Sequence, residues 1–296
     1  MSPVAEIGLI AARELRKSTR SVKGIILGLL TLLGSALAIF ICIWIESTAR
    51  DKLGADSTEA FAQLQEQMYI KGGTDPGLAA YLAHTPLSLM VFLKVMVWVG
   101  PLLVALLGFD SVSGDLQHRG VRFWTVRTRR WSYLLGKFFG LWGTVSGITL
   151  ALVVLSGGAV LIRGYISFSQ FFSWGLRFWL VSALIVGTWS AIAIFVSTRF
   201  KTPLLALLST FGVFFAIWFT GVVGLVSRLF DAAKPGDEEH ARMVSVHWYE
   251  YLNPNGYDDL LLSPKPSMVA AGLGACAVYM IVFVGLSALL FAKKDV

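Results

Sequence analysis

Residues Asp110 to Lys137 read DSVSGDLQHRGVRFWTVRTRRWSYLLGK, a polar and basic segment between two apolar runs. One apolar run ends at Phe109, and the next begins at Trp131. The basic residues of the segment are Arg119, Arg122, Arg127, Arg129, Arg130 and Lys137. Positive charge between two membrane-length apolar runs predicts a loop on the cytoplasmic side of a membrane, where it can meet a soluble partner.

The composition indicates a membrane protein. Hydrophobic residues make up 56% of the 296 residues and charged residues only 15%, whereas soluble domains average about 45–50% and about 25%. Six apolar runs are long enough to span a bilayer, at about 24–45, 87–109, 131–162, 174–196, 204–226 and 267–291. The predicted fold class is therefore an all-α polytopic membrane protein with six transmembrane helices.

Two domains are predicted, an interfacial helix over residues 1–23 and a six-helix membrane domain over 24–296. In the leader, apolar residues recur at helical spacing on one face, opposite the arginines. The apolar face holds Val4, Ile7, Ala11, Leu15 and Val22, and the basic face holds Arg13, Arg16 and Arg20. Such a helix is typical of a membrane surface. The alternative is a solvated basic leader that orients the first span.

The distribution of charge predicts the orientation. The leader, the loop after the second span, the turn after the fourth and the C-terminal tail hold 15 of the 25 Lys and Arg residues, against 9 on the other side. We therefore expect both termini and the loop 110–130 to be cytoplasmic, and segments 46–86 and 227–266 to lie outside. This asymmetry accounts for the net charge of +7 without a nucleic-acid partner.

The sequence offers no catalytic or metal-binding pattern. The four histidines are scattered, Cys42 and Cys276 lie inside apolar runs, and no GxxxxGK[ST] nucleotide-binding loop is present. We expect neither an enzyme nor a metal site. Lys94 is the one basic residue well inside a span, and it either faces a polar translocation path, pairs with a carboxylate, or snorkels outward along its own stem.

The basic loop is the strongest functional signal. Val112, Leu116, Gly120 and Phe123 recur at three- and four-residue spacing, which predicts a short amphipathic helix. Such a helix suits docking into a groove on a soluble partner, and the alternative is a helix that binds anionic lipid at the membrane surface. The predicted docking residues are Ser113, Gly114, Asp115, Leu116, Arg119, Gly120, Phe123, Trp124 and Arg127.

The chain carries several further motifs, which are Asp110, the Gly114-Asp115 pair, Arg130, the Leu134-Leu135-Gly136-Lys137 opening of the third span, and Leu252-Asn253-Pro254 before the sixth. These motifs resemble those of the type-2 ABC exporter permeases, especially the NosY-like six-span subunits. The Arg13-Glu14-Leu15 leader is similar to the interfacial helix of that family. In layout the resemblance covers the whole chain, and in motif it covers about thirty residues.

The resemblance implies a mechanism. Two such chains, identical or different, would form a pore in a bacterial-type plasma membrane, with ABC ATPase subunits that bind ATP and Mg²⁺ on the cytoplasmic side. The segment around Ser113–Trp124 would be the coupling helix. The alternatives are a membrane scaffold or sensor that recruits a cytoplasmic partner through the same loop, and a secondary transporter, which would need more intramembrane ionisable sites than Lys94 alone. The transported substrate is open.

Overall fold

A computed structural model describes residues 2–53, 57–71, 74–118, 120–121, 124, 128–164, 166–232 and 251–294. These residues are helical or lie in turns, and no strand occurs among them. The helices are α1 (Pro3–Arg20), α2 (Val22–Leu53), α3 (Ser57–Lys71), α4 (Pro76–Leu82), α5 (Leu87–Gly108), α6 (Ser113–Gln117), α8 (Arg130–Ile162), α9 (Phe168–Arg199), α10 (Pro203–Ala232), the 3-10 helix η3 (Pro254–Tyr257), α11 (Asp258–Leu262) and α12 (Pro266–Ala292).

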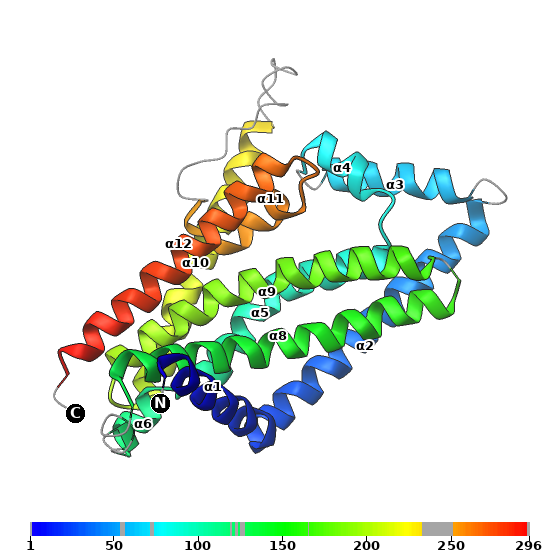
Figure 1. Cartoon of the computed structure of the whole chain (residues 1–296). Helices are drawn as coiled ribbons and strands as arrows, with labels where there is room; N and C mark the ends of the chain where they lie inside the picture. The colour runs from blue at the N-terminus through cyan, green and yellow to red at the C-terminus, as the bar shows by residue number, and fades with distance from the viewer. Residues whose placement is uncertain are drawn as a thin grey trace.

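Six of the helices in the described part of the chain are long and apolar enough to cross a membrane. They are α2, α5, α8, α9, α10 and α12. The predicted fold class, an all-α protein with six membrane-spanning helices, is confirmed. Both termini and α6 lie at one end of the molecule, here called the terminal end (Figure 1). Helices α3 and α4 lie at the other end, here called the opposite end.

Helix α9 forms the centre of the bundle. Over an apolar stretch of 18 residues in α9, 83% of the residues are buried. Over the corresponding stretches of α2, α10 and α12, only 17% of the residues are buried in each helix. Helix α8 is joined to α9 by two indole hydrogen bonds. Trp142 Nε1 of α8 donates to the carbonyl of Ala183 at 2.7 Å, and Trp179 Nε1 of α9 donates to the carbonyl of Ser146 at 3.0 Å. These bonds satisfy buried indole N–H groups where water is absent.

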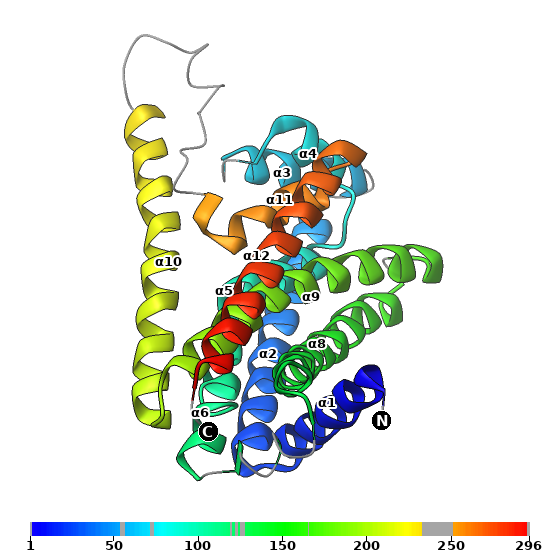
Figure 2. The ribbon, with the colours of Figure 1, turned by 60° about the vertical axis from the view of Figure 1, so that its left-hand side comes forward.

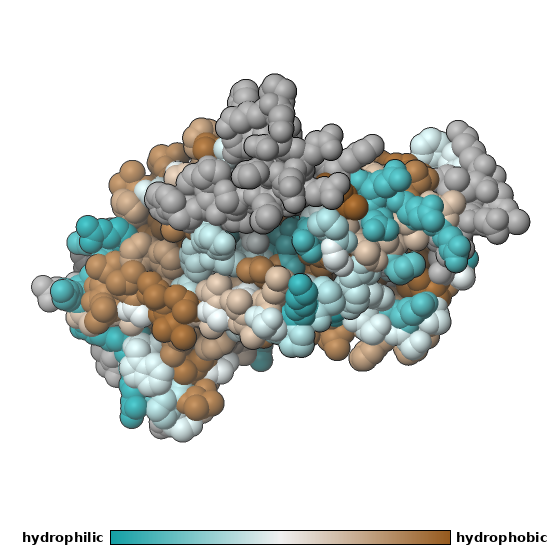
Figure 3. All heavy atoms as spheres, turned by 90° about the horizontal axis from the view of Figure 1, so that it is seen from above, coloured by the Kyte–Doolittle hydropathy of each residue, from teal (hydrophilic) through white to brown (hydrophobic). Residues whose placement is uncertain are grey.

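The peripheral helices leave much apolar surface open. Helix α10 stands apart from the rest of the bundle in Figure 2. Large exposed side chains such as Leu208 and Phe215 lie along it, and Leu33 and Phe40 are exposed on α2. Seen from above, hydrophobic residues also reach the surface in broad patches, while hydrophilic residues gather toward the right-hand side, where α3 lies (Figure 3). Apolar surface of this extent requires lipid or a protein partner.

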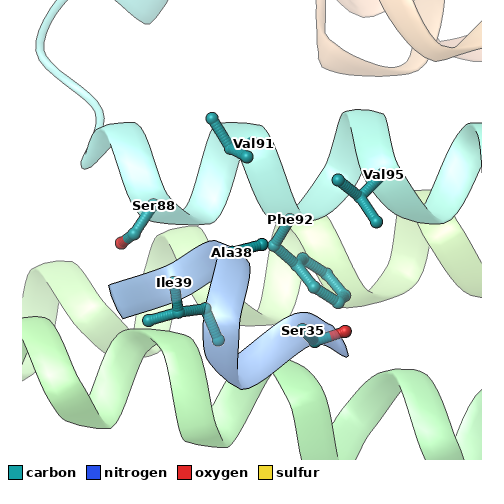
Figure 4. A pocket seen from close by; sticks show the side chains of 7 residues that line it. All are labelled: Ser35, Ala38, Ile39, Ser88, Val91, Phe92 and Val95. Carbon is teal, nitrogen blue, oxygen red and sulfur yellow. The ribbon is translucent and has the colours of Figure 1, made fainter. Parts of the chain in front are cut away.

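Helices α2 and α5 meet through small, branched and aromatic side chains. Figure 4 shows Phe92 of α5 extending toward α2, near Ser35 and Ile39. The cavity left between these residues is about 10 Å³, enough for a single water molecule. Ser88 borders it at the start of α5 and is buried. This contact holds the sparsely buried α2 against the bundle near the opposite end.

Helix ends extend beyond the apolar runs. Helix α2 continues to Leu53, so Glu46 is helical, and α9 begins at Phe168 rather than near Trp174. Segment 46–86, which the charge distribution predicts to lie outside, contains α3 and α4 in addition to the end of α2. Hydropathy marks where a helix meets the bilayer, but backbone hydrogen bonding continues into water wherever the residues favour a helix.

Candidate functional site

Helix α1 packs tightly across the start of α8 at the terminal end. A Cβ added at Gly136 would lie 2.5 Å from Ile10 Cβ, and one added at Gly140 would lie 2.5 Å from Glu14 Cβ. Only glycine permits so close an approach. The GxxxG spacing at Gly136 and Gly140 therefore serves a contact within this chain.

This packing buries an ion cluster made of Glu14, Asp115, Tyr133 and Lys137, here called the Lys137 cluster. Lys137 Nζ lies 2.6 Å from Glu14 Oε1 and 2.8 Å from Asp115 Oδ2. The Tyr133 hydroxyl donates to Asp115 Oδ2 at 2.7 Å. The Lys137 side chain is only 2% exposed. Because the cluster takes one residue from α1, one from α6 and two from α8, it ties these three helices together.

The start of α6 is fixed from the other side by α9. The backbone N–H groups of Val112 and Ser113 both donate to Ser197 Oγ at 3.1 Å. Ser197 Oγ in turn donates to the carbonyl of Phe109 at 2.8 Å. The first turn of a helix has N–H groups without intrahelical acceptors, and Ser197 supplies one for two of them. Helix α6 is thus held between α8 and α9.

Further contacts attach α1 and the start of α2 to the two flanks of the loop. Lys23 Nζ lies 2.8 Å from Asp110 Oδ1, and the Arg129 N–H donates to Glu6 Oε2 at 3.3 Å. The Arg13 guanidinium carbon lies 4.4 Å from the centre of the Trp124 ring, a cation–π distance. The start of α2 therefore contacts the loop before α6, while α1 contacts the loop after α6 and reaches α6 through the Lys137 cluster.

The predicted docking residues fall into three groups. Ser113 is buried against Ser197, Asp115 belongs to the Lys137 cluster, and Leu116 packs on the core. Gly114, Gly120 and Trp124 are half-buried at the terminal end. Arg119, Phe123 and Arg127 lie outside the described residues. The first group is engaged within the chain, so a partner would reach the half-buried residues and the exposed Gln117 and His118.

The predicted faces of α1 are rearranged by packing on α8. The buried residues of α1 are Glu6, Ile10 and Glu14, whereas Val4 is 77% exposed and Leu15 is 41% exposed. The apolar stripe thus remains partly open, although Leu15 also borders Gly143 of α8. Its contact with a membrane surface stays a prediction.

At the opposite end, Lys94 of α5 pairs with two carboxylates. Its Nζ lies 2.7 Å from Asp258 Oδ2 and 3.2 Å from Asp259 Oδ1, both on α11. Burial raises the pKa of Asp258, while the charge of Lys94 acts in the opposite direction. Of the alternatives for Lys94, the structure shows the carboxylate pair. A role in a translocation path stays a prediction.

Two more polar contacts hold η3 and α11 against α9. Arg177 Nη2 donates to the carbonyls of Leu262 and Ser263, each at 2.8 Å. Trp189 Nε1 donates to Asn255 Oδ1 at 2.8 Å. Residues 253–263, here called the clamp segment, are therefore fixed to α5 and α9 through side chains.

We expect Lys94→Met to loosen the clamp segment. The variant leaves the buried Asp258 carboxylate without its cation, which should lower the free energy of unfolding by about 1–2 kcal/mol. Denaturant unfolding of the purified protein in detergent measures this change. Adding Asp258→Asn should recover part of the loss, and an unchanged unfolding midpoint in Lys94→Met would contradict the role of the pair.

Sequence reasoning missed the pairing of Lys137 with Glu14. Both residues stood in motifs of interest, but nothing in a single sequence links positions that are 123 residues apart. A lysine just inside a predicted span and a glutamate on an amphipathic leader were the available signals. Among the described residues, no group of three or more His, Cys, Asp and Glu side chains could hold a metal ion.

The fold and the site define a multi-pass helical membrane protein with a short helix held at its terminal end by ionic contacts. Residues 9–296 match the family model of the ABC-2 family transporter protein, so the chain belongs to that family. Its membrane domain is thus a transport component of the ABC-2 permease type. The NosY-like subtype stays a prediction. No curated protein matches the sequence closely enough to count as a relative.

Proposed function

We propose that this chain is the permease subunit of an ATP-driven exporter, in which a separate ABC ATPase subunit docks at the terminal end. The observation that carries the proposal is the Lys137 cluster, because it joins α6 rigidly to a membrane-spanning helix and to α1. The family membership supports the transporter part of the proposal. ATP and Mg²⁺ would be bound by the ATPase.

The orientation follows from charge. The terminal end carries the basic leader, the basic loop and the cationic tail, so we place it in the cytoplasm of a bacterial-type cell. Lys294 also contacts the carbonyls of Thr198 and Arg199, which keeps the tail beside the turn that follows α9. A cytoplasmic ATPase would meet this surface first.

The coupling step is mechanical. Movement of an ATPase that grips the exposed side of α6 would displace α6, and the Lys137 cluster would pass that displacement to α8 and α1. Ser197 would pass it to α9 at the same time. Since α9 forms the centre of the bundle, its displacement would alter the packing of several spans. The chain itself would supply no bond-breaking chemistry.

A second permease chain would cover part of the open apolar surface. In each of α2, α10 and α12, only 17% of the residues in the apolar stretch are buried. These helices therefore present the largest apolar faces to lipid or to another chain. We propose a dimer, formed either by two copies of this chain or by this chain and a related one. Lipid would cover the remaining faces.

We expect Gly120→Trp to abolish association with the ATPase subunit while folding is preserved. Gly120 is half-buried next to α6, and an added Cβ would contact the Asp115 backbone at an ordinary 3.7 Å, so the indole would project onto the proposed docking surface. Co-purification in nanodiscs with ATPase subunits from the same cell, followed by an ATPase assay, measures the loss.

Gly8→Trp is the matched control, because Gly8 lies on an exposed part of α1 with nothing within 4 Å of an added Cβ. It should leave association unchanged. If Gly120→Trp still couples ATP hydrolysis normally, the docking surface is wrongly assigned. If wild-type protein recruits no ATPase while folded, the exporter proposal fails.

A further inference from the structure

A pocket of about 430 Å³ lies between α5, α9 and α10, beside η3. Helix α10 stands apart from the rest of the bundle in Figure 2, and the pocket lies along the face of α10 that is turned toward α5 and α9. Its volume falls in the range of about 300–1,000 Å³ that is usual for small-molecule sites. None of the described residues that line it is charged, so the pocket suits a neutral molecule.

The lining of the pocket is mainly aromatic. The rings of Trp98 on α5 and Trp218 on α10 meet edge to face, with their centroids 6.0 Å apart. Those of Trp189 on α9 and Phe214 on α10 also meet edge to face, with their centroids 4.4 Å apart. A flat aromatic molecule gains ring stacking between such walls in addition to the burial of apolar area, whereas a lipid acyl chain gains only the burial. Six of the ten lining residues are aromatic, namely Trp98, Trp189, Phe211, Phe214, Phe215 and Trp218.

Asn255 supplies the polar group of the pocket. Its Oδ1 accepts from Trp189 Nε1 at 2.8 Å, while its Nδ2 donates to none of the described residues. By helical rise Trp189 stands about 15 Å from the end of α9 at Arg199, so the amide lies at the depth of the membrane-spanning helices. A donor without an acceptor is costly there. A bound molecule with an acceptor atom would satisfy it, and an acyl chain would not.

We propose that this pocket binds a flat aromatic molecule that carries a hydrogen-bond acceptor, such as a carbonyl on its ring system. The rings lie among the aromatic side chains of the lining, and the carbonyl accepts from Asn255 Nδ2. The inference rests on the proposed function in one respect, since it makes such molecules the substrate class of the exporter. Binding itself needs no ATPase, so the pocket and the exporter proposal can fail separately.

Fluorenone is a suitable probe, because it is a flat aromatic ketone, and fluorene is the matched probe without the carbonyl. The purified full chain in nanodiscs should bind tritiated fluorenone saturably in a scintillation proximity assay, after subtraction of the signal from empty nanodiscs. Fluorene should bind about fivefold more weakly, because it leaves the Asn255 donor unsatisfied. The absence of saturable fluorenone binding, which is expected if acyl chains fill the pocket, overturns the proposal. Equal binding of the two probes also overturns it.

Variants locate the site. Trp218→Leu removes one aromatic wall and should weaken fluorenone binding about fivefold. Trp44→Leu makes the same change at an exposed position of α2 outside the lining and should leave binding unchanged. Asn255→Leu should abolish the preference for fluorenone over fluorene. If Trp218→Leu does not fold, Phe215→Leu decides, because Phe215 lines the pocket and is itself exposed. Fluorenone binding that is insensitive to these lining variants overturns the site.

A second copy of this chain could instead cover the pocket. Nanodiscs that hold one chain and nanodiscs that hold two chains separate the two cases. Equal binding of fluorenone per chain in both preparations supports the ligand site. Loss of binding in the two-chain nanodiscs shows that the partner chain fills the pocket, and it overturns the proposal.

The substrate role is tested in the assembled transporter. Fluorenone should stimulate ATP hydrolysis, and Trp218→Leu should raise the fluorenone concentration needed for half-maximal stimulation about fivefold. Saturable binding without stimulation, in a complex that contains the ATPase, overturns the substrate role. If no ATPase associates with the folded chain, the exporter proposal fails, while the result of the binding assay still decides whether the pocket takes aromatic ketones.

Discussion

Replacing Lys137 by methionine should lower the free energy of unfolding by about 3 kcal/mol or more, because it leaves the carboxylates of Glu14 and Asp115 buried without their shared cation. The side chains are similar in length and volume, so the loss reports charge rather than a cavity. Denaturant unfolding in detergent measures it. Lys17→Met, which removes an exposed lysine on α1, should cost less than about 1 kcal/mol.

A second change tests the electrostatic origin of this effect. Adding Glu14→Gln and Asp115→Asn to Lys137→Met removes the two uncompensated charges, so the triple variant should regain most of the lost stability. If the exporter proposal is right, a transporter assembled with the triple variant should still show weak stimulation of ATP hydrolysis by substrate. The reason is that the rigid connection between α6 and α8 is gone. Full stability in Lys137→Met alone would show that the cluster contributes nothing to folding.

The sequence predicted the spans well because long apolar runs have one stable environment, the bilayer. It predicted the polar segments less well. Residues 57–71 and 76–82 form α3 and α4 within a stretch that hydropathy marks only as polar. The ends of α2 and α9 also extend past the apolar runs, since helical hydrogen bonding does not stop at the lipid boundary.

Side-chain pairing could not be read from the sequence. The sequence left three placements open for the Lys94 side chain: a translocation path, a carboxylate partner or snorkelling. Its partners Asp258 and Asp259 lie 164 and 165 residues further along the chain. The amphipathic helix at Ser113 was predicted from spacing, yet the buried contacts of Ser113 with Ser197 depend on how α9 ends. Periodicity assigns residues to faces, and only the packing of distant helices decides which face is covered.

Spacing also does not show which glycines of α8 lie under another helix. The structure shows this, and it predicts a large effect for a substitution at Gly136. Gly136 and Gly147 both stand at GxxxG spacing on α8, and spacing alone does not rank them. An added Cβ at Gly136 would lie 2.5 Å from Ile10 Cβ and 3.2 Å from the backbone oxygen of Ile7, whereas one at Gly147 meets nothing within 4 Å. The two positions therefore form a matched pair.

Gly136→Leu should separate α1 from α8 and thereby open the Lys137 cluster. The expected cost is about 1–3 kcal/mol, because the clash involves backbone and cannot be relieved by rotating one side chain. Trypsin should then cleave α1 after Arg13 or Arg16 about tenfold faster in nanodiscs, since cleavage requires local opening of the helix. Gly147→Leu should leave the cleavage rate unchanged.

The Gly136→Leu and Gly147→Leu variants also test the coupling proposal. If α1 holds the cluster in place, Gly136→Leu should reduce substrate-stimulated ATP hydrolysis in the assembled transporter even though its position lies away from the proposed docking surface. Equal cleavage rates in Gly136→Leu and Gly147→Leu would show that α1 is not held on α8. In that case Lys137 would gain no shielding from α1, and the large loss expected for Lys137→Met would lose its physical basis.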